Sequence, residues 1–196
     1  MGAAFTRWLL TWMASTALVL AIFLGAWVVL LHGYHWLPEV DAQRHAIVSY
    51  LLRGMGNELP EMAYLNPAEA FHLLDVRQLF ARVDRLFVGV LACCLLLLYG
   101  WKRFAGGCLA LHSGYLGLAC ILLLGLLMAL GGFVPLFVLL HYWLFPAGNW
   151  VFPDDSLLIR LFPLDYFFRF GLVYGVVVLG MFVGLIVWGH TRGRLS

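Results

Sequence analysis

The stretch WLLTWMASTALVLAIFLGAWVVLLHGYHWLP occupies residues 8–38 and contains no Asp, Glu, Lys or Arg. A membrane-spanning helix needs about 20 mostly apolar residues, so this stretch is long enough to cross a bilayer. Its apolar run is about 24 residues, longer than a signal-peptide core, and we expect it to be retained rather than cleaved. Three further stretches, 86–101, 104–153 and 170–191, lack the same four residue types. The sequence therefore predicts an all-α membrane protein with four transmembrane helices.

The composition excludes several classes of protein. Of 196 residues, 64% are hydrophobic and only 11% are charged. A water-soluble domain cannot bury that much apolar surface, which argues against a cytosolic enzyme, a nucleic-acid binder and a disordered chain. The four cysteines lie in apolar stretches without CxxC spacing. We therefore predict no metal site.

The predicted spans are about 8–31, 86–104, 107–133 and 169–189, within a single integral membrane domain of residues 1–196. They leave the outer segments 32–85 and 134–168, of which 32–85 and 142–168 form an extracytoplasmic cap.

The charges predict the orientation of the chain. With both termini in the cytoplasm, the inner side carries only positive charge and the outer side carries all ten carboxylates. The inner cations are Arg7, Lys102, Arg103, Arg192 and Arg194. This distribution follows the positive-inside rule.

The first outer segment has signals for two helices. One begins after Asp41, carries apolar residues at helical spacing and ends at Gly54. The second begins with the capping box Asn66-Pro67-Ala68-Glu69. Its polar residues His72 and Asp75 are three positions apart and project from one face. If this helix ran straight into the membrane, His72 would stand about 20 Å above the second span, so we expect the helix to lie along the membrane.

Histidine is the main candidate for chemistry outside the membrane. Five of the seven histidines are outside or at the outer interface, namely His32, His35, His45, His72 and His141. For each of them the ordinary interpretation is a structural histidine. His141 lies in the apolar sequence VLLHYWLF, where a polar ring needs a partner. Ser156 follows two aspartates and is interpreted as a helix cap. An enzyme at this surface would therefore use histidine and carboxylate groups.

The block FPAGNWVFPDDS at residues 145–156 combines turn residues with large aromatic side chains. It is interpreted either as an interfacial anchor or as a substrate-contacting loop.

Two motifs resemble one family. The sequence His72-Leu73-Leu74-Asp75-Val76-Arg77 is similar to the H-M-x-D-V-K element of the bacterial four-span family that includes lipoprotein intramolecular transacylase. Residues 141–168 resemble that family's second signature, F-H-E-L-F-F followed by W-x-F and L-I-x-x-x-P. The chain departs from the pattern at Leu73, Arg77 and Tyr142, the last in place of an expected acid.

The resemblance implies an acyltransferase of the bacterial cytoplasmic membrane with an extracytoplasmic active site. Its substrate would be a diacylglyceryl-modified lipoprotein among membrane lipids, and the sn-2 acyl chain would move to the α-amine of the modified cysteine, giving a lyso-form lipoprotein. It implies catalytic roles for His72 and His141, with Asp75 orienting His72 or raising its basicity, and it implies no cofactor. The candidate substrate-binding residues are Arg77, Asn149, Trp150 and Arg160. Which histidine is the base, and the oligomeric state, stay open.

Two alternatives accompany this prediction. One is a non-catalytic membrane scaffold or assembly factor whose aromatic outer loop binds a partner. The other is a metal or haem site between His72 and His141.

Overall fold

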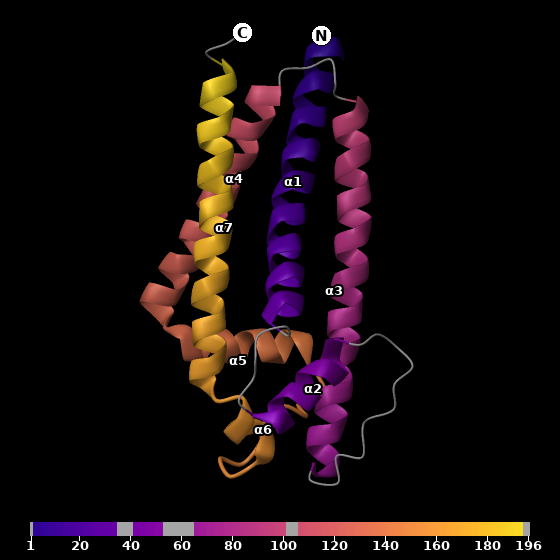
Figure 1. Ribbon diagram of the computed structural model, residues 1–196. Helices are drawn as coiled ribbons and strands as arrows, with labels where there is room; N and C mark the ends of the chain where they lie inside the picture. The colour runs from indigo at the N-terminus through magenta and orange to yellow at the C-terminus, as the bar shows by residue number, and fades with distance from the viewer. Residues whose placement is uncertain (1, 35–40, 53–64, 101–105, 194–196) are drawn as a thin grey trace. The chain divides into compact units, whose positions relative to one another are not determined.

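The computed structural model describes residues 2–34, 41–52, 65–100 and 106–193 (Figure 1). Within these ranges all regular structure is helical and no strand occurs, which confirms the all-α prediction. The helices are α1 (Gly2–Tyr34), α2 (Ala42–Leu52), α3 (Pro67–Gly100), α4 (Gly106–Gly131), α5 (Phe133–Leu144), α6 (Leu157–Leu161) and α7 (Leu164–Gly193). Gly54 and residues 101–104 of the predicted second span lie outside the described residues.

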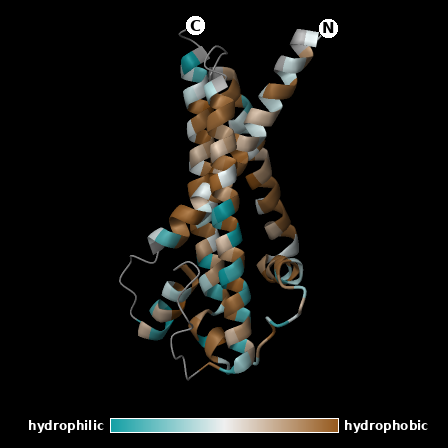
Figure 2. Cartoon of the chain, turned by 90° about the vertical axis from the view of Figure 1, so that its right-hand side faces the viewer, coloured by the Kyte–Doolittle hydropathy of each residue, from teal (hydrophilic) through white to brown (hydrophobic). Residues whose placement is uncertain are grey.

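Three helices are long and apolar enough to cross a membrane. The candidate spans are Trp8–Gly33, Cys108–Gly131 and Leu164–Arg192, on α1, α4 and α7. Figure 2 shows apolar residues predominating along much of the long helices. The remaining predicted span, which is the second along the chain, would use the second half of α3. This segment is not among the three candidate spans. α7 begins five residues before the predicted start of the last span, because Asp165 and its neighbours already belong to its first turn.

The chain divides into two compact units. Unit 1 comprises Met1–Val28, Arg85–Leu126 and Val173–Ser196, and unit 2 comprises Val29–Asp84 and Leu127–Leu172. In unit 1, α1 and α7 share a core of Val19, Ile22, Ala26, Val178 and Phe182. α4 joins this core closely, since the ring of Phe182 occupies the space where a side chain on Gly117 would lie. Glycine permits this approach between membrane helices.

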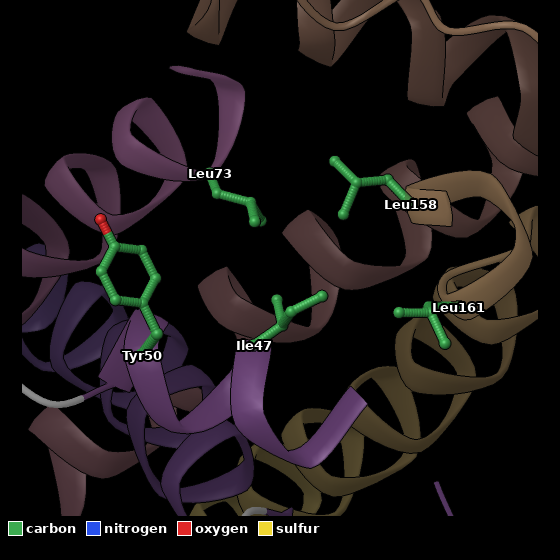
Figure 3. Packing of buried hydrophobic residues seen from close by; sticks show 5 residues of the cluster. All are labelled: Ile47, Tyr50, Leu73, Leu158 and Leu161. Atoms are coloured by element: carbon green, nitrogen blue, oxygen red, sulfur yellow. The ribbon is translucent and has the colours of Figure 1, made fainter. Parts of the chain in front are cut away.

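Unit 2 has a separate apolar core. α2, α3 and α6 contribute Ile47, Tyr50, Leu73, Leu158 and Leu161, all at most 6% exposed. Figure 3 shows these five side chains converging from the three helices. The core fixes α6 and the turns beside it against the first turns of α3.

A single buried carboxylate caps two helices of unit 2. Glu69 Oε2 accepts from the Asn66 backbone N–H at 2.9 Å, and Asn66 Oδ1 accepts from the Glu69 N–H at 2.9 Å. This is the predicted capping box. Glu69 Oε1 also accepts from the backbone N–H of Leu158 in the first turn of α6, at 3.1 Å. The Glu69 side chain therefore holds the beginning of α6 against the beginning of α3, although 89 residues separate the two ends of the bond.

Two other predicted helix starts are confirmed. Asp41 Oδ1 accepts from the N–H groups of Gln43 and Arg44 at the beginning of α2. Ser156 caps α6 by accepting from the Ile159 N–H. Such caps satisfy donors that have no partner within the helix.

The third predicted span ends near residue 133, and the structure has a break in the helix at this position, followed by a further helix. Gly132 adopts a φ of 82°, a left-handed conformation that glycine adopts without steric cost. The chain then forms α5, nearly all of which belongs to the predicted outer segment 134–168. With 12 residues, α5 is too short to cross a membrane.

The helix that carries His72 differs from the prediction in one respect. We expected it to lie along the membrane before the second span, which requires a break near residue 85. α3 instead continues without a break for 34 residues from Pro67 to Gly100. Its sequence contains no proline after Pro67 and only one internal glycine, Gly89, so no strong helix breaker interrupts it.

Replacing Glu69 by alanine should lower the free energy of unfolding by about 2–4 kcal/mol, because two helix starts lose an acceptor within a buried region. Asp165→Ala is the matched control, since Asp165 forms an exposed ion pair with Arg169 on α7 and should contribute about 1 kcal/mol or less. Chemical unfolding in detergent micelles measures both values. Equal losses for the two variants would contradict the structural role of Glu69.

Candidate active site

Two histidines from distant parts of the chain lie side by side in unit 2. His72 belongs to the second turn of α3 and His141 to the last turn of α5. Their ring centroids are 6.5 Å apart and their planes differ by 31°. One small reacting group can therefore lie within reach of both rings.

An aromatic series along α5 supports His141. Phe133, Phe137 and His141 are spaced four residues apart and project from one face of the helix. Phe133 contacts Phe168 and Phe137 contacts Phe167, with ring centroids 5.3 and 5.2 Å apart. Phe137 also packs on His141 at 4.1 Å. α5 thus bridges from the first turns of α7 to the first turns of α3.

Aromatic side chains enclose the two imidazoles. The buried Phe145 ring lies 4.9 Å from His72 and 5.6 Å from His141. Phe152 lies 5.5 Å from His72, and Trp150 lies 5.1 Å from His141. Both rings are partly buried among these aromatic side chains, so a charge on either ring is solvated less well than in water.

This environment favours the neutral form of both histidines. Burial and, to a smaller extent, the nearby His141 lower the pKa of His72 from 6.5 to about 4, while the charge of Asp75 opposes the shift. Burial also lowers the pKa of His141, and its hydrogen bond to Phe137 opposes that change. Both imidazoles are therefore uncharged at neutral pH.

One hydrogen bond determines which nitrogen of His141 can act as a base. His141 Nδ1 lies 2.8 Å from the backbone oxygen of Phe137. A carbonyl oxygen only accepts, so Nδ1 carries the proton and donates it. In the neutral ring the lone pair is then on Nε2.

The carboxylate of Asp75 bonds to a different partner from the one expected. Asn149 Nδ2 donates to Asp75 Oδ2 at 2.6 Å, linking α3 to the turn after α5. Among the described residues no hydrogen bond joins Asp75 to His72, and Asp75 influences His72 through its charge. Asp75 therefore holds Asn149 by a hydrogen bond and acts on the His72 imidazole through its charge, which raises the basicity of that ring.

Three buried polar atoms around the histidines lack a hydrogen-bond partner within the described part of the chain. They are His72 Nδ1, Asn149 Oδ1 and Trp150 Nε1. Buried polar atoms in native proteins are nearly always hydrogen-bonded, so such a cluster indicates groups that meet a ligand. The set contains a donor, Trp150 Nε1–H, and an acceptor, Asn149 Oδ1.

The remaining predicted residues lie at other positions. The Arg77 guanidinium lies 4.5 Å above the ring of Tyr50, next to the unit 2 core. Arg160 is exposed on α6, and no described contact brings it to either histidine. Tyr142, which replaces the expected acid, packs edge-on against Trp150 at 5.1 Å.

Large apolar side chains near the histidines are exposed. They are Phe71 and Leu74 on α3, and Leu139, Leu140, Trp143 and Leu144 on α5. Trp143, for example, is 81% exposed. Exposed apolar clusters of this kind indicate contact with lipid or with an apolar ligand.

The metal alternative lacks ligands among the described residues. No group of three or more His, Cys, Asp or Glu side chains could hold an ion there. The paired histidines alone do not form the closed coordination shell of a structural zinc site.

Two aromatic residues of the site, Phe133 and Phe137, were not predicted from the sequence. Phe145, Trp150 and Phe152 belong to the aromatic block 145–156. For Phe133 and Phe137, the spacing of four residues from one another or from His141 was the available signal. It was ambiguous, because such spacing is common on helices that contact lipid.

Comparisons with known proteins identify a family and a shared fold. A family model described as lipoprotein intramolecular transacylase Lit matches residues 37–167. The solved structure of the membrane integral lipoprotein intramolecular transacylase Lit from Bacillus cereus is similar, with a TM-score of 0.80 and 18% identity, covering 98% of this chain and 100% of that one.

Two structures of the same Bacillus protein carry a substitution of one histidine. The arginine variant has a TM-score of 0.77 and covers 97% of this chain and 93% of that one. The alanine variant has a TM-score of 0.77 and covers 98% and 97%. Both are 18% identical to this chain, a level that shows the shared fold. A search of curated protein sequences found no match.

The lowered pKa of His72 predicts a pH-dependent stability. Between about pH 6.5 and 4 the unfolded chain binds a proton at this ring and the folded chain does not, so stability is lost as the pH falls through this window. His72→Gln should reduce that loss, because glutamine does not titrate. Thermal unfolding in detergent between pH 7 and 4.5 measures the slope. His32→Gln, which removes an exposed ring paired with Asp84, should not flatten the slope, and a wild-type slope in the His72 variant would contradict the buried neutral imidazole.

Proposed function

The chain belongs to the lipoprotein intramolecular transacylase (Lit) family, and from this premise we propose that it moves an acyl chain within a lipoprotein. The substrate is a lipoprotein whose N-terminal cysteine carries a diacylglyceryl group. The sn-2 acyl chain moves from glycerol to the α-amine of that cysteine, which leaves a lyso-form lipoprotein. The observation that carries this proposal is the 6.5 Å distance between the ring centroids of His72 and His141 among aromatic side chains.

The reaction needs no added reactant. The α-amine nitrogen attacks the sn-2 ester carbonyl, a C–N bond forms, and the C–O bond to glycerol breaks. The proton that leaves nitrogen ends on the glycerol oxygen, so the products are an amide and a free sn-2 hydroxyl. Nucleophile and ester belong to one molecule, and holding them together supplies much of the rate.

His141 is the proposed general base. Its Nε2 lone pair takes the proton from nitrogen and returns it to the departing oxygen. While the ring is cationic, the Phe137 carbonyl still accepts from Nδ1, which supports the charged form. The ring needs no prior deprotonation at neutral pH, since burial keeps it uncharged.

His72 is the proposed donor to the oxyanion. With a pKa of about 4 it is neutral at the working pH, and it therefore acts as a neutral imidazole N–H rather than as an imidazolium acid. A donor preorganised in an apolar site stabilises the negative charge that develops on the carbonyl oxygen. Asp75 opposes the loss of basicity at His72 and positions Asn149.

The other polar residues are proposed to hold the substrate. Trp150 Nε1–H suits an ester carbonyl, and Asn149 suits a donor on the substrate. Arg77 and Arg160 are proposed to contact carbonyl or headgroup oxygens at the edges of the site. The exposed apolar side chains of α5 would meet acyl chains in the outer leaflet.

We further propose four spans in a bacterial cytoplasmic membrane, at about 8–31, 86–104, 107–133 and 169–189. Both termini would then be cytoplasmic, and the outer segments 32–85 and 134–168 would carry the active site. Three long apolar helices and short inner segments that carry positive charge without any carboxylate support this arrangement.

An impermeant maleimide checks the orientation in cells. In a background without the native cysteines, Ser156→Cys should react from outside, whereas Ser196→Cys should react only after the membrane is opened. Reaction of both, or of Ser196→Cys alone, would overturn the proposed topology.

His72→Ala and His141→Ala should each reduce formation of lyso-form lipoprotein by roughly 100-fold or more, because each removes a group that acts on the transferred proton or the oxyanion. Mass spectrometry of lipopeptides from cells expressing each variant measures the product, and immunoblotting of membranes measures the amount of protein. His32→Ala is the matched outer histidine and should keep wild-type activity. Undiminished product in both site variants would favour a scaffold role over this mechanism.

A further inference from the structure

The pairing of Asp75 with Asn149 determines which way the asparagine amide faces. An ionised carboxylate has only acceptor atoms, so the Nδ2 group of Asn149 must point to Asp75, and the bond is 2.6 Å long. The amide oxygen Oδ1 is thereby turned away from Asp75. This orientation follows from hydrogen-bond chemistry alone.

The oxygen turned away from Asp75 has no hydrogen-bond partner among the residues that the structure describes. Asn149 Oδ1 is buried and accepts no hydrogen bond within the described part of the chain. An unsatisfied buried acceptor is unfavourable, and a donor on a ligand would satisfy it. The next residue, Trp150, contacts the ring of His141, so the unpaired oxygen belongs to the same enclosure as the proposed base.

The substrate has few groups that can donate to this oxygen. Ester and thioether atoms of a diacylglyceryl cysteine only accept, so the donors near the reacting centre are the α-amine and the following peptide N–H. The α-amine is the nucleophile and must approach His141. We infer that Asn149 Oδ1 accepts a hydrogen bond from the substrate's α-amine and that Asp75 is the positioning residue that orients it. This inference rests on the proposed transacylase function.

A neutral amide suits this task better than a carboxylate. An ammonium group has no lone pair and cannot attack a carbonyl, and a carboxylate in direct contact would favour the ammonium form. Asn149 keeps the Asp75 charge one hydrogen bond away from the amine. Its amide is still polarised by that charge, which strengthens Oδ1 as an acceptor.

Binding of two unreactive lipopeptides tests the inference independently of acyl transfer. Both carry ether-linked alkyl chains in place of esters, and in one of them hydrogen replaces the α-amino group. At pH 9 the amine is neutral, because its ordinary pKa is about 7.7–8.0. Purified wild-type protein in detergent should bind the amino compound about 3- to 10-fold more tightly, as expected for one hydrogen bond.

The variants identify the residue responsible. Asn149→Ala should remove this preference. Asp75→Asn should reduce it, because an amide at position 75 can donate as well as accept and no longer enforces one orientation of Asn149. Asp84→Asn, a matched change on the same helix at an acid paired with His32, should leave the preference intact.

Equal binding of the two compounds by wild-type protein, or an undiminished preference in Asn149→Ala, would overturn the inference. An undiminished preference in Asp75→Asn would overturn the positioning role. Wild-type protein that shows the preference but makes no lyso-form lipoprotein from a diester substrate would instead contradict the proposed function.

Discussion

The Glu69 carboxylate accepts hydrogen bonds from the starts of two helices, and the geometry of unit 2 depends on this contact. One oxygen closes the capping box of α3, and the other holds the N–H of Leu158 in α6. A carboxylate that is 2% exposed would be costly without these partners. His72 follows one helical turn after Glu69. The contact between Glu69 and α6 therefore also fixes the position of His72 relative to α6.

The aromatic enclosure sets the chemistry of the two histidines. Imidazoles in water are partly charged near neutral pH, but burial among Phe145, Phe152 and Trp150 keeps both rings neutral. A neutral ring with one nitrogen committed to the Phe137 carbonyl presents a base on the other nitrogen. Acyl transfer from an ester to an amine needs a base and a hydrogen-bond donor to the oxyanion. Two neutral imidazoles can supply both without burying a charge before the substrate binds.

Helix starts were predictable because each depends on residues close together in sequence. The capping box at Asn66 and Glu69, the Asp41 cap and the Ser156 cap all satisfy donors within about three residues. The end of the third span near Gly132 was predictable for a different reason, because the apolar stretch 104–153 is too long for one membrane crossing. The uninterrupted course of α3 was not, because hydropathy changes near residue 85 while helix propensity does not.

The resemblance of two sequence motifs to the transacylase family, together with residue types, identified the two histidines, Asp75, Asn149 and Trp150 as candidates. Their assembly depends on contacts across 69 to 89 residues, such as His72 with His141 and Glu69 with Leu158. Packing of the core formed by α2, α3 and α6 brings these groups together, and no local rule encodes such packing. The partner of Asp75 illustrates this. Spacing on one helix face pointed to His72, whereas the folded chain supplies the Asn149 amide at 2.6 Å, and a short hydrogen bond to a carboxylate is stronger than a through-space attraction to a neutral ring.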